Sequence, residues 1–158
     1  MIMLPITGVD ENNILVTNAV ASVINSAFET GIAPENYHVK SLNEGGFLDA
    51  AFADSDMDTP SGKPAKADWT IVGKLEGYKW TTLTPKLALE RWVAYAGNRE
   101  SNEFSRTKVG MYLTYLAMLS NGFSKDSCDD FLMNMYEPDG VHDDFMAQVA
   151  FAEDVVYG

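Results

Sequence analysis

Apolar residues recur at intervals of three and four in the segment after Asp10, which begins with several capping residues. The apolar positions are Ile14, Leu15, Ala19, Val20, Val23, Ile24, Ala27 and Phe28. This spacing places them on one side of a helix, and Gly31 supplies its end. The chain therefore opens with a predicted amphipathic helix.

Strand-like alternation follows Pro34. The stretch "YHVKSL" at 37–42 predicts a short strand, and "NEGG" predicts a tight connection into "FLDAAF" at 47–52, which we expect to be another strand. In "DWTIVGKLEGYKWTTLT" at 68–84, apolar and aromatic residues alternate on each side of a Glu-Gly pair, which predicts a hairpin. The alternating residues are Trp69, Ile71, Tyr78 and Trp80.

Helical spacing returns at Thr84, because threonine caps helices and the proline after it is tolerated at the first helical position. The stretch "PKLALERWVAYAG" at 85–97 predicts a helix that Gly97 ends. We expect the polar residues 98–108 to be exposed. They lead to "VGMYLTYLAML" at 109–119, the most uniformly apolar segment, which we expect to be the central helix.

Two acidic helices are predicted in the last quarter of the chain. In "SKDSCDDFLMNMYE" Ser124 can cap a helix, and the residues expected to be buried are Cys128, Phe131, Leu132 and Met135. The residues expected to face outward are Asp126, Asp129, Asp130 and Asn134. In "DGVHDDFMAQVAFAEDVVYG" one face carries Phe145, Val149, Ala152 and Val156. The opposite face carries Asp143, Asp144, Ala147, Phe151 and Asp154, an acidic stripe with an aromatic ring in its middle.

These elements predict one α+β domain over residues 1–158, with a small antiparallel sheet from the N-terminal half packed against four or five helices. A chain of 158 residues with 46% hydrophobic residues is long enough for one core and short for two. No segment is long and apolar enough to cross a bilayer, and no basic region precedes an apolar one at the N-terminus. We therefore expect a cytoplasmic protein.

The net charge of −12, from 23 acidic and 11 basic residues, creates a field that repels nucleic acid and anionic lipid and attracts basic proteins. Residues 122–158 hold nine of the acids and a single base, Lys125. We expect no direct binding of nucleic acid and no membrane contact. The alternative is that the acidic residues serve only to keep the protein soluble.

Little in the sequence indicates catalysis or metal binding. Cys128 is the single cysteine, and two histidines are too few for a classical zinc site. His142 lies beside several aspartates and could join a carboxylate metal site, but a capping role is more typical. The loop "DSDMDTPSGK" at 54–63 lacks the glycine and glutamate of a calcium loop and the spacing of a phosphate loop, so we interpret it as exposed. We expect no cofactor, no bound metal and no catalytic residue.

The tryptophans and tyrosines could be read as stacking platforms for bases. No basic groove is apparent beside them, so we interpret them as core residues. Carboxylates on rigid helices can instead imitate the phosphates of DNA. The residues that we expect to bind a basic nucleic-acid-binding protein are Asp126, Asp129, Asp130, Glu137, Asp139, Asp143, Asp144, Phe151 and Asp154. The sequence leaves a homodimer open.

Several short stretches resemble the ArdB/KlcA antirestriction family of plasmids and phages. They are "MLPITGV", "NILVTNAVASVI", "YHVKSLNEGGFLDAAF" and "LEGYKWTTLTPKLALERWVAYAG", within residues 3–97. The tryptophan expected in the first helix is absent, the 54–67 loop looks inserted, and the acidic C-terminal region has no counterpart. The resemblance implies interference with type I restriction or a related defence, and it carries over no catalytic residue.

The function we expect is therefore that of a small, acidic, non-enzymatic inhibitor from a mobile element. Two alternatives remain open. One is a phage structural or assembly accessory protein, and the other is a carboxylate-metal enzyme that uses Asp129, Asp143 or Asp144.

Overall fold

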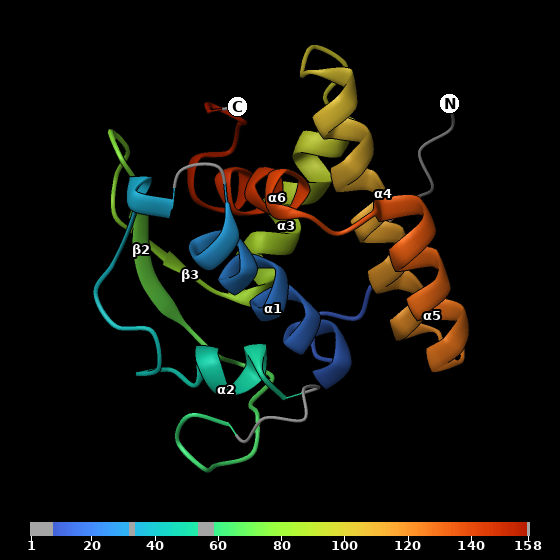
Figure 1. Cartoon of the computed structure of the whole chain (residues 1–158), viewed down its shortest axis with the longest axis horizontal. Coiled ribbons are helices and arrows are strands. Elements are labelled where there is room, and N and C mark those ends of the chain that lie inside the picture. The colour runs from blue at the N-terminus through green and yellow to red at the C-terminus, as the bar shows by residue number, and fades with distance from the viewer. Residues whose placement is uncertain (1–7, 32–33, 54–58, 158) are drawn as a thin grey trace.

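The computed structural model of the chain describes residues 8–31, 34–53 and 59–157 (Figure 1). The helices are α1 (Ile14–Thr30), α2 (Phe47–Ala51), α3 (Pro85–Gly97), α4 (Glu103–Ser120), α5 (Lys125–Phe131) and α6 (Gly140–Ala152). The strands are β1 (Tyr37–Val39), β2 (Ile71–Leu75) and β3 (Thr81–Leu83). A 3-10 turn, η2 (Pro34–Asn36), precedes β1, and a π-helical turn, η3 (Leu132–Tyr136), follows α5. The predicted α+β fold is confirmed.

The three strands form one antiparallel sheet in the order β1-β2-β3. Alternate residues of β2 are buried, which leaves one face of the sheet toward α6 and the other toward solvent. The predicted hairpin is present, and His38 pairs with Lys74 across β1 and β2. Tyr78 and Trp80, expected in the second strand, lie in the connection before β3 and are exposed. The sheet lies on the side of the molecule away from α4 and α5 (Figure 1).

The central helix is α6 and not the segment 109–119 that the sequence favours. Ten of the 13 residues of α6 are buried, whereas α4, which contains that segment, buries six of its 18. Contacts from α1, α3, α4 and the sheet surround α6 (Figure 1). The buried indole of Trp92 donates to the Met146 carbonyl oxygen of α6 at 2.8 Å, so the α3–α6 contact includes a satisfied hydrogen bond.

Two local predictions are wrong. The stretch "FLDAAF" forms α2, because Phe47 and Ala50 are buried at helical spacing and the Asn43 side chain accepts a hydrogen bond from the backbone of Asp49. The polar stretch 98–108 is not all exposed. Asn102 caps α4 six residues earlier than predicted, which buries Ser105 and Lys108.

Several predicted helix ends are confirmed. Thr84 Oγ1 accepts from the backbone of Leu87 at 3.1 Å, and Ser124 Oγ accepts from the backbone of Ser127 at 3.1 Å. Asn13 caps α1.

The acidic loop at 54–63 can be followed only in part, since Asp54, Asp56 and Asp58 lie outside the described residues. Its described end is attached to α2. The buried carboxylate of Asp49 accepts hydrogen bonds from the backbone and hydroxyl of Ser61. Although burial alone would raise it, these hydrogen bonds hold the pKa of Asp49 below its ordinary value.

Two glycines at helix ends provide a matched test of the packing. A methyl group at Gly140, where α6 begins, would collide with the Thr30 carbonyl oxygen at the end of α1. A methyl group at Gly97 meets nothing within 4 Å. We expect Gly140→Ala to lower the free energy of unfolding by about 1–3 kcal/mol, and Gly97→Ala to raise it by up to about 1 kcal/mol. Urea denaturation measures both, and equal effects would contradict the close approach of α1 to α6.

Candidate functional site

The acidic residues of α5 are in solvent. Asp126 and Asp130 are exposed, and Asp129 is partly exposed beside Lys125, whose ammonium lies 2.9 Å from its carboxylate. The Asn134 amide donates to Asp130 at 2.8 Å. The outward orientation predicted for these polar residues is confirmed, whereas Met135, expected to be buried, is exposed.

Two further carboxylates lie in the turn between η3 and α6. Glu137 ends η3 with a left-handed backbone, φ 58°, and its side chain is 65% exposed. Asp139 caps α6, because its Oδ1 accepts from the backbone of His142 at 2.7 Å. Its side chain remains 52% exposed. We define the acidic face as Asp126, Asp129, Asp130, Glu137 and Asp139.

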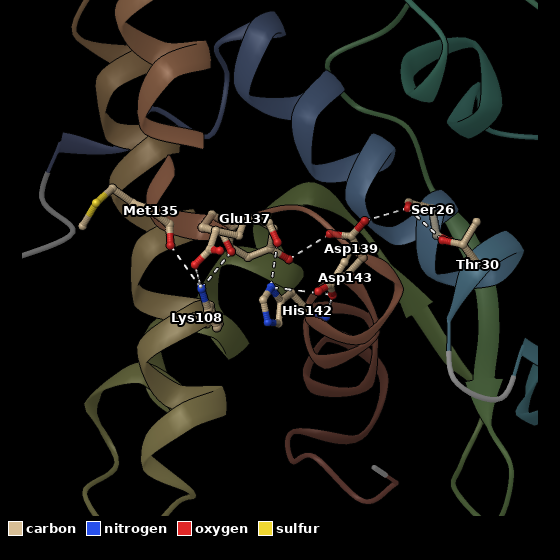
Figure 2. Close-up of polar contacts among 9 residues, drawn as sticks. Ser26, Thr30, Lys108, Met135, Glu137, Asp139, His142 and Asp143 are labelled. Carbon is tan, nitrogen blue, oxygen red and sulfur yellow. Dashed lines mark hydrogen bonds and ion pairs between the residues drawn. The ribbon is translucent and has the colours of Figure 1, made fainter. Parts of the chain in front are cut away.

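Lys108 of α4 holds this turn from beneath (Figure 2). Its buried ammonium donates to the carbonyl oxygens of Met135 at 3.1 Å and Tyr136 at 3.0 Å, and lies 3.3 Å from the Glu137 carboxylate. A helix C-terminus leaves carbonyl oxygens without partners inside the helix, and a cation there is stabilising. Lys108 therefore fixes the position of Glu137. In the sequence, the one indication of this role is that Lys108 lies on the same side of a helix as Tyr112, which is buried.

Asp143 does not belong to an exposed stripe, which corrects the sequence prediction. It is buried at the start of α6, where Ser26 of α1 donates to Oδ2 at 2.7 Å (Figure 2). Tyr136 of η3 donates to Oδ1 at 2.9 Å. Burial raises the pKa of Asp143, and the two hydrogen bonds offset part of that rise. Its charge is engaged inside the protein and cannot bind a partner.

Asp144 and Phe151 are also buried, against the prediction. The carboxylate of Asp144 accepts from the hydroxyl of Tyr37 in β1 at 2.7 Å and from the amide of Gln148 at 2.5 Å. Burial raises the pKa of Asp144, and these hydrogen bonds lower it in part. Phe151 packs against Tyr37 and Phe28, with ring centroids 6.3 and 6.0 Å away.

Asp154 is exposed but lies apart from the acidic face. It follows the end of α6, whereas Asp139 precedes its start, and 13 helical residues span about 20 Å at 1.5 Å per residue. Asp154 instead lines a surface pocket of about 460 Å³ together with Glu100 and Phe104. The nine residues predicted to bind a partner therefore separate into five exposed carboxylates between residues 126 and 139, one exposed carboxylate at the other end of α6, and three buried residues.

The geometry offers little to a metal or a substrate. The imidazole of His142 is buried, and its Nδ1 lies 2.7 Å from the Glu137 carbonyl oxygen, which fixes the proton on that nitrogen. A cavity of about 150 Å³ lies beside Asp143, but both carboxylate oxygens already accept hydrogen bonds from the protein. Within residues 8–31, 34–53 and 59–157, no three His, Cys, Asp or Glu side chains are grouped to hold a metal ion.

Comparison with protein-family models, with curated proteins and with solved structures finds no match to this chain. The resemblance to the ArdB/KlcA family stays a prediction. No helix in the described part of the chain is long and apolar enough to span a membrane.

The buried aspartates make stability depend on pH in a defined direction. Burial raises the pKa of Asp143 and of Asp144 in the folded protein above the ordinary value of 3.8. The folded state thus holds these protons more tightly, so their contribution to stability is fully present below pH 3.8 and is lost as the pH rises through the folded-state pKa.

We expect the free energy of unfolding of Asp143→Asn and Asp144→Asn to fall less steeply with rising pH over this window than that of the wild type, as measured by urea denaturation at a series of pH values. Parallel curves for wild type and both variants would show that neither carboxyl group is perturbed by burial.

Proposed function

We propose that this chain is a non-enzymatic binding protein whose acidic face engages a basic, nucleic-acid-handling protein. The observation that carries the proposal is that five carboxylates of one short segment, residues 125–139, remain in solvent while Lys125 is the single base of that segment. A surface of one sign attracts a partner of the opposite sign and raises the rate of encounter.

The acidic face is held in a fixed arrangement. Ser124 caps α5, Asp139 caps α6, and Lys108 anchors the turn between them. Groups that are already in position lose less conformational entropy on binding, so more of the interaction energy appears as affinity.

Exposed apolar side chains lie in and directly before the same segment. Phe123 is 55% exposed, Met133 61% and Met135 45%. Methionine adapts to irregular surfaces, and apolar anchors surrounded by polar groups are typical of protein interfaces. This composition favours a protein partner with basic and apolar groups over a simple polycation.

The class of partner follows from the resemblance between spaced carboxylates and the phosphates of DNA. A groove lined with Lys and Arg that evolved for DNA recognises phosphates largely by charge, and rigid carboxylates can compete for it. The resemblance of residues 3–97 to the ArdB/KlcA family supports a restriction complex as the target. The proposed activity is therefore antirestriction by occupation of a DNA-binding surface.

Neutralising α5 tests this function. We expect the triple variant Asp126→Asn, Asp129→Asn, Asp130→Asn to lose relief of type I restriction, scored by the plating of unmodified phage on a restricting strain that expresses the chain. With about 0.5 kcal/mol for each exposed charge pair, its dissociation constant for the purified restriction complex rises about tenfold. Wild-type affinity should fall as salt rises.

The matched control removes the same amount of charge at the other end of α6. The control variant is Glu100→Gln, Glu153→Gln, Asp154→Asn. It should keep both restriction relief and affinity. An equal loss of restriction relief and affinity in both triple variants would show that only the net charge matters and not the acidic face. Wild-type affinity that does not change with salt would contradict the acidic face as the binding surface.

A further inference from the structure

The outer face of the sheet differs in charge from the rest of this acidic chain. Alternation along β2 turns Ile71 and Leu75 toward the core and leaves Lys74 on the opposite face of the sheet. Lys40 follows β1 directly and extends its pairing, since its backbone donates to the Val72 carbonyl oxygen at 3.0 Å. Two lysines from separate segments thus reach one exposed sheet face.

The ring of Trp80 contacts both lysines. Its ring centroid is 4.9 Å from the ammonium nitrogen of Lys40 and 5.2 Å from that of Lys74, and the residue is 47% exposed. The other two tryptophans, Trp69 and Trp92, are fully buried, with their indole nitrogens bonded to backbone carbonyls. Trp80 therefore has no part in the core, although the sequence alone favours one for it.

A carboxylate in the hairpin turn has a partner of its own. Glu76, in the hairpin turn, pairs with the ring of His38, which faces Lys74 across β1 and β2. Lys79 adds a further exposed cation to the same turn. The hairpin and the end of β1 therefore combine three lysines with an accessible indole.

The net charge of −12 does not rule out an anionic ligand at this position. The strands and the acidic face of α5 lie on opposite sides of the molecule (Figure 1). A compact chain of this length is about 30 Å or more across, and the Debye length at physiological salt is about 8 Å. The acidic face is thus largely screened from the sheet surface, and local charge decides what binds there.

We propose that the outer face of the sheet binds single-stranded nucleic acid, with a base stacked on Trp80 and neighbouring phosphates paired with Lys40 and Lys74. An exposed ring beside cations is the arrangement that single-strand-binding surfaces use. A peptide of acidic residues alone could satisfy the lysines but offers no flat ring to the indole. Paired bases in a duplex are stacked on one another, so their faces cannot reach Trp80.

This inference does not depend on the acidic face. It assigns the opposite side of the molecule a second ligand. It thereby departs from the expectation of no direct nucleic-acid binding, which rested on the net charge and on the lack of an apparent basic groove beside the aromatic residues.

The fluorescence of Trp80 provides the test, because the other tryptophans are shielded. We expect an oligothymidylate of about ten nucleotides to quench the emission of the full chain saturably at low salt. Trp80→Leu should remove the quenching and weaken binding, followed with a labelled oligonucleotide, about tenfold. Trp80→Tyr should keep most of the affinity, since tyrosine also stacks.

Charge variants test the phosphate contacts. Lys40→Gln and Lys74→Gln should each lower the slope of log affinity against log salt by about 0.7, the value for single strands, while Lys86→Gln on α3 should leave it unchanged. Thermal unfolding confirms that each variant is folded. Absence of quenching, equal affinity for a duplex, or equal quenching by polyglutamate of similar length would each overturn the proposal.

Discussion

The carboxylate of Asp143 is the interaction on which the arrangement of the C-terminal half depends. It accepts one hydrogen bond from Ser26 of α1 and one from Tyr136 of η3, and so joins three separate segments at a buried point. A buried carboxylate without partners would cost several kcal/mol, so the core is stable only when both donors are present. Asp144 plays the same part toward Tyr37 of the sheet. These two residues allow α6 to occupy the centre of the fold.

The acidity of the last quarter of the chain therefore serves two purposes. Asp143 and Asp144 specify packing, whereas the carboxylates of α5 and of the turn before α6 remain available to solvent. The buried Lys108 connects the two groups, because it secures the carbonyl end of η3 and the side chain of Glu137 together. A rigid acidic surface on one side and a basic aromatic surface on the other are the features that the proposals rest on.

Local signals predicted much of the fold. Helix caps at Thr84 and Ser124, the Glu-Gly hairpin and the amphipathic first helix depend on neighbouring residues, which a sequence displays directly. Contacts between distant residues were not predictable in this way. Nothing near Asp143 in the sequence shows that Ser26 will face it across 117 positions.

The same limit explains the errors in the candidate site. Helical periodicity assigns one face of α6 to solvent, but residues of both predicted faces are buried within this helix. The carboxylates of the polar face accept hydrogen bonds from tyrosines, serine and glutamine. The sequence favours a core position for Trp80, because its contacts with Lys40 and Lys74 exist only once the sheet has formed.

The division of the acidic residues into buried and exposed groups can be measured by carbodiimide labelling of carboxyl groups in the folded protein, read by mass spectrometry. The account predicts rapid modification of Asp126 and Asp130, and protection of Asp143 and Asp144 until the chain is denatured. Modification of Asp143 and Asp144 in the folded state as fast as that of Asp126 would contradict it.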